Sequence, residues 1–117
     1  MYKTSREDFS YFTKRCRAYL AQLSLGDWKP IFEHVDHVGS YAWVKPDSEA
    51  KQAQIGLSVH WDDSKVTREM LDYCARHEVL HILLADLVNV GKLRTSTEQD
   101  FSGAQHAIIR RLENMWQ

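Results

Sequence analysis

The chain has 117 residues, of which 44% are hydrophobic and 26% are charged, and its formal net charge is −1. This length and composition are typical of one soluble globular domain covering residues 1–117. The near-neutral charge disfavours a general nucleic-acid binder, no apolar run approaches the about 20 residues of a membrane span, and residues 1–10 lack a signal-peptide core. We therefore expect a cytoplasmic protein that does not associate with a membrane.

A first helix is predicted to begin at Ser5, with Glu7 and Asp8 in its first turn, where carboxylates favour the helix dipole. Apolar residues then recur every three or four positions and form one stripe that can pack on a sheet. Gly26 is a candidate C-terminal cap, and Pro30 prevents the helix from continuing. The stripe consists of Phe9, Phe12, Cys16, Tyr19, Leu20 and Leu23.

Residues 31–61 are predicted to form strands, because β-branched and aromatic residues replace the helical pattern. Two apolar segments, 31–35 and 41–44, are separated by Gly39 and Ser40, and Pro46-Asp47-Ser48 signals a turn. Residues 52–60 then alternate between apolar and polar side chains, as in a strand with one buried face. Because the connections are short, we expect an antiparallel meander of about three strands.

A second helix is predicted over residues 66–88, with helix-start residues at 62–64 and with Asn89 and Gly91 at its end. One stripe of this helix is expected to face the protein interior. Polar groups on such a face need partners or a metal, because unsatisfied buried polar groups are costly. The stripe consists of Met70, Cys74, His77, His81, Leu84 and Val88.

A last helix is predicted from Glu98 or Ser102 to Trp116, with apolar residues at helical spacing. The expected fold class is therefore α+β. It comprises an N-terminal helix, a small, three-stranded, mostly antiparallel sheet, a second helix and a C-terminal helix.

The two cysteines, Cys16 and Cys74, fall on apolar positions of predicted helices. Two such residues form neither a disulfide framework nor a cysteine-ligated zinc site. We expect both to be buried free thiols.

The segment His77-Glu78-Val79-Leu80-His81 of the second helix reads H-E-x-x-H. Histidines at this spacing lie on one helical face about one turn apart, and both imidazoles can reach a zinc ion at roughly 2.0–2.1 Å. Glu78 points partly off that line and can reach a water on the metal, so we expect it to act as the general base. Two imidazoles with a third nitrogen or oxygen ligand favour zinc over magnesium or calcium.

A catalytic zinc site usually has three protein ligands and one position open to water. The extended metzincin motif is excluded, because Leu84 and Leu87 stand where it requires glycine and histidine. We expect the third ligand to come from the last helix, and His106 is the first candidate because it supplies a nitrogen ligand. The alternatives are Glu98, Glu113 and, as a poorer ligand, Gln105.

Three histidines remain outside this pattern. His34, His37 and His60 lie in or beside the predicted strands, and we expect ordinary surface histidines there. One of them, or Tyr41 or Tyr73, could stabilise an oxyanion in a transition state.

The order of helix, strands, H-E-x-x-H helix and last helix resembles that of the minimal zincins, which are small metallopeptidase-like domains of phages and bacteria. Residues 77–87 look like their active helix, and residues 104–113 look like their last helix. These domains often carry an acidic residue in the region of Gln105 and His106, which completes a gluzincin-type site. The resemblance implies a zinc-dependent peptidase whose extended substrate adds as one more strand to the sheet of residues 31–60.

Three functions follow from these observations. The first is a zinc metallopeptidase acting on a protein or peptide, with Glu78 passing the water proton to the leaving amine. The second is a zincin-fold metal-binding protein with little or no turnover that binds a partner protein, although a structural metal site does not need Glu78. The third and weakest is a nucleic-acid-associated module. It would use a cluster of Lys14, Arg15, Arg17, Arg110 and Arg111.

Overall fold

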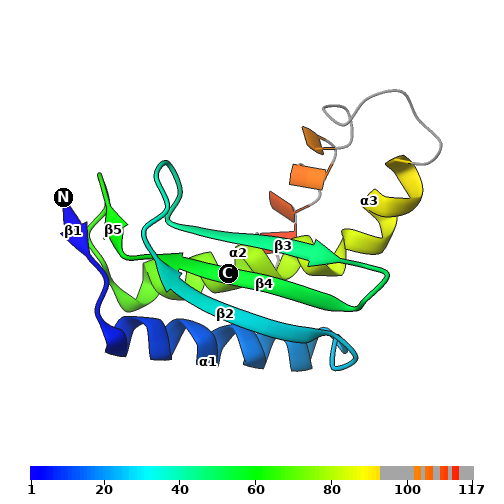
Figure 1. The fold of residues 1–117 in the computed structure, drawn as a ribbon, viewed down its shortest axis with the longest axis horizontal. Coiled ribbons are helices and arrows are strands. Elements are labelled where there is room, and N and C mark those ends of the chain that lie inside the picture. The colour runs from blue at the N-terminus through cyan, green and yellow to red at the C-terminus, as the bar shows by residue number, and fades with distance from the viewer. Residues whose placement is uncertain (93–101, 104, 107–108, 111, 114–117) are drawn as a thin grey trace.

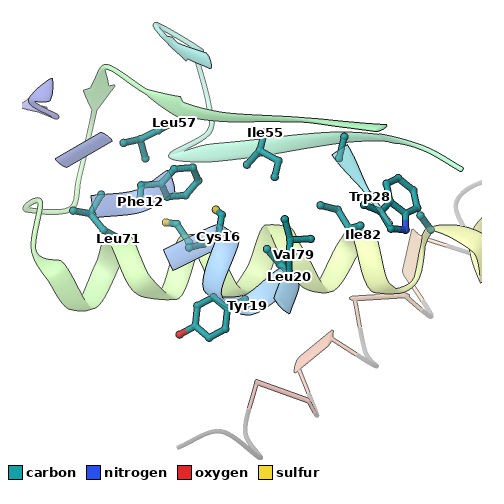
Figure 2. Close-up of a cluster of buried hydrophobic side chains, with 14 of the residues drawn as sticks. Phe12, Cys16, Tyr19, Leu20, Trp28, Ile55, Leu57, Leu71, Val79 and Ile82 are labelled. Atoms are coloured by element: carbon teal, nitrogen blue, oxygen red, sulfur yellow. The ribbon is translucent and has the colours of Figure 1, made fainter. Parts of the chain in front are cut away.

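Two helices pack against one face of a small mixed sheet, and a pair of short strands lies at one end of the molecule (Figures 1 and 2). This arrangement is seen in a computed structural model that describes residues 1–92, 102–103, 105–106, 109–110 and 112–113. The predicted α+β class is confirmed. The elements are, in chain order, β1 (Tyr2–Lys3), α1 (Arg6–Gln22), β2 (Lys29–Val35), β3 (Ala42–Asp47), β4 (Gln52–Ser58), β5 (His60–Trp61), α2 (Arg68–Leu83) and α3 (Ala85–Lys92).

The start of α1 is confirmed, because Ser5 caps the helix as predicted. The Ser5 hydroxyl accepts a hydrogen bond from the Asp8 N–H at 3.0 Å, and the Asp8 carboxylate accepts one from the Ser5 N–H at 2.8 Å. Such a reciprocal capping box satisfies two donors that the helix start leaves open. The predicted end at Gly26 is wrong. The helix ends at Gln22, and Ser24, with a φ of 58°, takes the left-handed conformation that follows its C-terminus.

The strand order of the three-stranded sheet is β2-β4-β3, so the predicted meander is wrong. β3 and β4 pair antiparallel across the turn at 48–51, as expected, but β2 pairs with β4 in parallel. β4 takes the centre because Ala53, Ile55 and Leu57 are completely buried against the helices (Figure 2). On the opposite face, Gly56 leaves the space that the Trp43 indole occupies, and a Cβ at this glycine would lie 2.0 Å from that ring.

Two strand boundaries also differ from the prediction. β3 continues through Pro46 and Asp47, which the sequence pattern assigns to a turn. A proline is tolerated there because β3 is an edge strand and can do without one donor. β4 ends at Ser58, and His60 begins β5, which pairs antiparallel with β1. The predicted strand 52–60 is therefore divided, and this second pairing has no counterpart in the prediction.

The helix predicted over residues 66–88 is in fact two helices. Thr67, and not the 62–64 segment, caps α2, since its hydroxyl accepts a hydrogen bond from the Met70 N–H at 3.1 Å. Leu84 is the C-cap of α2, and α3 turns away from the α2 axis after it (Figure 1). Asn89 and Gly91, which are predicted to end the helix, lie inside α3.

The buried face of α2 lies one position further along the helix than predicted. Cys74 and Leu84 are buried, as expected. His77, His81 and Met70 are only half-buried, so the two motif histidines lie at the margin of the packed face. The most deeply buried α2 side chains on the core side are Leu71, Ala75, Val79 and Ile82.

The main core fills the space between the sheet and the helices (Figure 2). Phe12, Ile55 and Val79, from α1, β4 and α2, are completely buried in it. Cys16 and Cys74 are free and buried, as predicted. Among the described residues, no helix has the length and apolar character that crossing a membrane requires.

The predicted last helix is described in part. Residues 102, 103, 105, 106, 109, 110, 112 and 113 are helical. Ile109 is completely buried and forms a second apolar cluster with Leu80 and Leu84, which fixes this segment against the α2 region. The predicted boundaries at Glu98 and Trp116 lie outside the described residues.

Candidate metal centre

His77 and His81 lie one turn apart on α2, with ring centroids 5.0 Å apart and 71° between the ring planes. The helix that carries them is held by the Thr67 cap and by its packing in the core. The two imidazoles therefore project from a rigid element, which fixes the spacing that a metal site requires.

His106 brings a third imidazole to the same place from the last helix. Its ring centroid lies 5.0 Å from that of His81 and 6.2 Å from that of His77. One ligand nitrogen from each of the three histidines lies within 4.8 Å of the others. Nitrogens bound to one tetrahedral zinc at 2.0–2.1 Å lie about 3.3 Å apart, so small side-chain rotations would complete the set. The structure thus brings together the three first-choice ligands of the sequence analysis.

Two of these histidines use their Nδ1 atoms in hydrogen bonds. The Nδ1–H of His77 donates to Oε1 of Glu113 at 2.8 Å, and the Nδ1–H of His106 donates to the Ser102 carbonyl oxygen at 2.8 Å. Metal-binding histidines commonly donate their second ring N–H to a carboxylate or a carbonyl, which fixes the tautomer and the ring orientation. In both residues the Nε2 lone pair is consequently left for a metal.

The third imidazole, that of His81, is held in its neutral form. Burial, together with charge repulsion from the neighbouring His77 and His106, lowers its pKa to about 4. A hydrogen bond with the Gln105 side chain opposes this shift. A neutral imidazole keeps the lone pair that a metal needs, so this environment favours coordination near pH 7.

Glu78 is a buried carboxyl group directed into the same site, with only 8% of the residue exposed. Among the described residues, no group donates a hydrogen bond to it. Burial, with a smaller contribution from the charge of Glu113, raises its pKa to about 8. A group with a pKa near the working pH can both take up and release a proton, which is the property of a general base.

A cleft of about 810 Å³ opens over the three histidines. β3 contributes Ala42 and Val44 to its lining, and α3 contributes Ala85 and Val88, while Glu78 is also exposed to the cleft. This volume lies within the usual range for pockets that bind small ligands or short peptide segments. The three histidines and the edge strand therefore belong to one concave surface.

Glu113 is a ligand candidate in the sequence analysis, but its carboxylate contacts the far side of the His77 ring. Gln105 likewise contacts His81. Glu98 lies outside the described residues. The sequence does indicate that Glu113 lies near the three histidines, because it follows His106 by two helical turns and shares its helical face.

Neither tyrosine proposed for an oxyanion lines the cleft. Tyr73 lies close by, with its ring centroid 6.0 Å from that of His77, and burial and the nearby Glu113 raise the pKa of its hydroxyl group. Tyr41 instead packs against Trp61, with ring centroids 4.8 Å apart. Tyr73 therefore supports the outer side of the site.

The other three described histidines contribute nothing to the cleft. Each makes local contacts within the sheet region, as expected for histidines without a metal role. Their neighbours are Thr4 and Phe9 for His34, Trp43 for His37 and Asp36 for His60.

Two of the basic residues expected to form a cluster, Arg15 and Arg17, contact other groups. Nε of Arg15 donates to Oδ1 of Asp72 at 2.6 Å, which links α1 to α2. The guanidinium of Arg17 lies over the Phe32 ring, 5.0 Å from its centroid. Arg111 is outside the described residues.

Comparisons with protein-family models, with curated proteins and with solved structures found no match for this chain. A function must therefore be argued from the chemistry and geometry of the site itself.

Proposed function

We propose that this protein is a zinc-dependent metallopeptidase of the minimal zincin kind. His77, His81 and His106 hold the metal, and Glu78 is the general base. The observation that carries the proposal is the convergence of three imidazoles beside a buried carboxyl group without a hydrogen-bond donor among the described residues, all in one cleft.

The residues present fit zinc in several respects. Three imidazole nitrogens suit this metal, and three protein ligands leave one position open. The Nδ1 hydrogen bonds of His77 and His106 leave Nε2 free in each ring, and burial keeps His81 neutral. When bound, zinc would supply a Lewis acid that acidifies a water molecule and polarises the scissile carbonyl group.

The protein's own groups would then carry the proton and hold the ligands. The Glu78 carboxylate takes a proton from the attacking water and delivers it to the leaving amine. Its raised pKa suits this second step, because the protonated form is present near neutral pH. Glu113 keeps the His77 ring oriented and increases its basicity through the hydrogen bond to Nδ1.

The substrate platform in this proposal is the free edge of β3. The Ser58 N–H donates to the Tyr41 carbonyl oxygen at 2.9 Å, and pairs with and without hydrogen bonds alternate along an antiparallel ladder. Ala42 and Val44 therefore direct their backbone groups away from β4, where an extended peptide can pair with them. Pro46 has no N–H and would end this pairing.

The first test is the substitution Glu78→Gln, which preserves shape but removes the base. We expect the variant to bind zinc with wild-type stoichiometry and to lose about 10²–10⁴-fold of its cleavage rate on an unbiased peptide library. Glu69→Gln, on an exposed position of the same helix, is the matched control. Wild-type cleavage by the Glu78→Gln protein would show that the base is wrongly assigned. A wild-type protein that binds zinc but cleaves nothing would favour a partner-binding role.

A further inference from the structure

The lining of the cleft includes two exposed carboxylates that form no ion pair with a described lysine or arginine. Asp47, the last residue of β3, and Glu49, in the turn that follows, line the cleft together with the three histidines. Both are exposed, and only Oδ1 of Asp47 is engaged, accepting hydrogen bonds from the N–H groups of Glu49 and Ala50 at 3.1 Å. Lys51, which follows them, is paired with Asp86 at 2.8 Å.

The described residues that line the cleft include no lysine and no arginine. Apart from the histidines, the ionisable side chains that line the cleft are therefore all carboxyl groups. Zinc would offset the charge of Glu78 at the centre of the site. The negative charge at the Asp47 and Glu49 end would stay unbalanced until a ligand arrives.

A separate observation marks the cleft as a ligand site. Glu78 is 8% exposed, faces into the cleft and receives no hydrogen bond from any described residue. Its carboxyl oxygens are not among the fully enclosed atoms without a partner, so they reach the cleft, where a bound molecule can hydrogen-bond to them. The acidic end thus belongs to a concavity that is arranged to receive another molecule.

We propose that this cleft selects peptides with a lysine or arginine side chain that meets Asp47 and Glu49. This inference deepens the proposed function and rests on it, because it names the substrate class of the same site. A strand rises about 3.3 Å per residue, so Asp47 lies about 10 Å along β3 from Val44. A peptide paired with that edge would place the basic residue a few positions from the cleaved bond, on one side only.

The charge preference is best measured by binding, independently of turnover. The probes are labelled, acetylated alanine hexapeptides in which lysine, norleucine or glutamate occupies each position in turn. Their affinities for the zinc-loaded Glu78→Gln protein are measured by fluorescence polarisation, and cleavage of the same set is measured with the wild type. The test variant is Asp47→Asn with Glu49→Gln, since asparagine can still accept the turn hydrogen bonds. The control is Asp62→Asn with Asp63→Asn, which removes the same charge from exposed positions outside the cleft.

We expect lysine to bind about threefold to tenfold more tightly than norleucine at one position or two adjacent positions, and glutamate to bind most weakly. High salt should reduce this ratio, because it screens exposed charges. The ratio should fall towards one in the Asp47 and Glu49 variant and persist in the Asp62 and Asp63 control.

Equal affinities, a ratio that survives loss of Asp47 and Glu49, or no peptide binding at all would overturn the inference. The same measurements distinguish failure of this inference from failure of the proposed function. A protein that prefers basic peptides but binds no zinc would refute only the metallopeptidase. A protein that cleaves with zinc but without charge preference would refute only the basic specificity.

Discussion

Replacing Glu78 with glutamine should stabilise the metal-free protein at neutral pH. Burial raises the pKa of this carboxyl group from 4.5 to about 8. Between these values the unfolded chain releases the proton while the folded protein keeps it, so the free energy of unfolding decreases as the pH rises. One pKa unit corresponds to about 1.4 kcal/mol. Because pH 7 lies about 2.5 units above the ordinary pKa of this group, keeping the proton in the folded protein costs up to about 3 kcal/mol of stability at that pH. Glutamine has no proton to release and escapes this cost.

The assay is urea unfolding of chelator-treated wild-type and Glu78→Gln proteins between about pH 5 and pH 8. We expect the stability advantage of the variant to grow from under about 1 kcal/mol at pH 5 to about 3 kcal/mol at pH 7. His81 acts in the opposite direction, because burial lowers its pKa from 6.5 to about 4 and stability is lost as the pH falls through that interval. Both proteins contain His81, so their difference isolates Glu78. Parallel stability profiles of the two proteins would refute the reasoning.

Three further predictions concern single contacts. Glu113→Gln should weaken zinc binding about tenfold in a competition with a chromophoric chelator, because the hydrogen bond that orients His77 loses its charge; unchanged affinity would remove Glu113 from the site. Gly56→Ala should lower the free energy of unfolding by about 1–3 kcal/mol, since the added Cβ would lie 2.0 Å from the Trp43 ring, and a neutral effect would mean that the indole moves freely. Ser5→Ala should cost about 1 kcal/mol in thermal unfolding through loss of the helix cap, whereas Ser5→Thr should not.

The local parts of the fold could be predicted from the sequence. The Ser5 cap, the buried cysteines and the buried apolar face of residues 53–57 depend on neighbours a few positions away, and they appear as expected. The expected exposed face is only partly confirmed, because Gly56 and Ser58 are buried as well. The strand order could not be predicted from chain adjacency, because it depends on which strand is buried most deeply. Gly56 accepts the Trp43 indole from a neighbouring strand, and this contact becomes visible only once the strands are paired.

The site likewise combines local features that the sequence predicts with tertiary contacts that it does not predict. The spacing of His77 and His81 fixes their shared helical face, and His106 joins them as its position on the next helix suggests. The sequence stripe placed the histidines on the buried side, but α2 is rotated by one position, and Glu78 is the more buried residue. The sequence makes Glu113 a ligand candidate because carboxylates bind zinc. Its carboxylate instead contacts Nδ1 of His77, and this contact depends on the packing of the last helix.

The bend at Leu84 had no signal in the sequence, since neither proline nor glycine marks it. It nevertheless matters for the cleft, because α3 leaves the α2 axis there (Figure 1), and Ala85 and Val88 of α3 line the cleft together with residues of β3. The lining of the cleft is therefore a tertiary property, whereas the pairing of His77 with His81 in the candidate metal centre is local.

The most direct test of the account is the zinc content of purified wild-type protein beside His106→Ala and Glu98→Ala, measured by elemental analysis after exposure to the metal. If three imidazoles bind one metal ion, the wild type and Glu98→Ala should each contain one zinc per chain. His106→Ala should contain none. A His106→Ala protein that keeps its full zinc content, or a wild type that binds none, would contradict it.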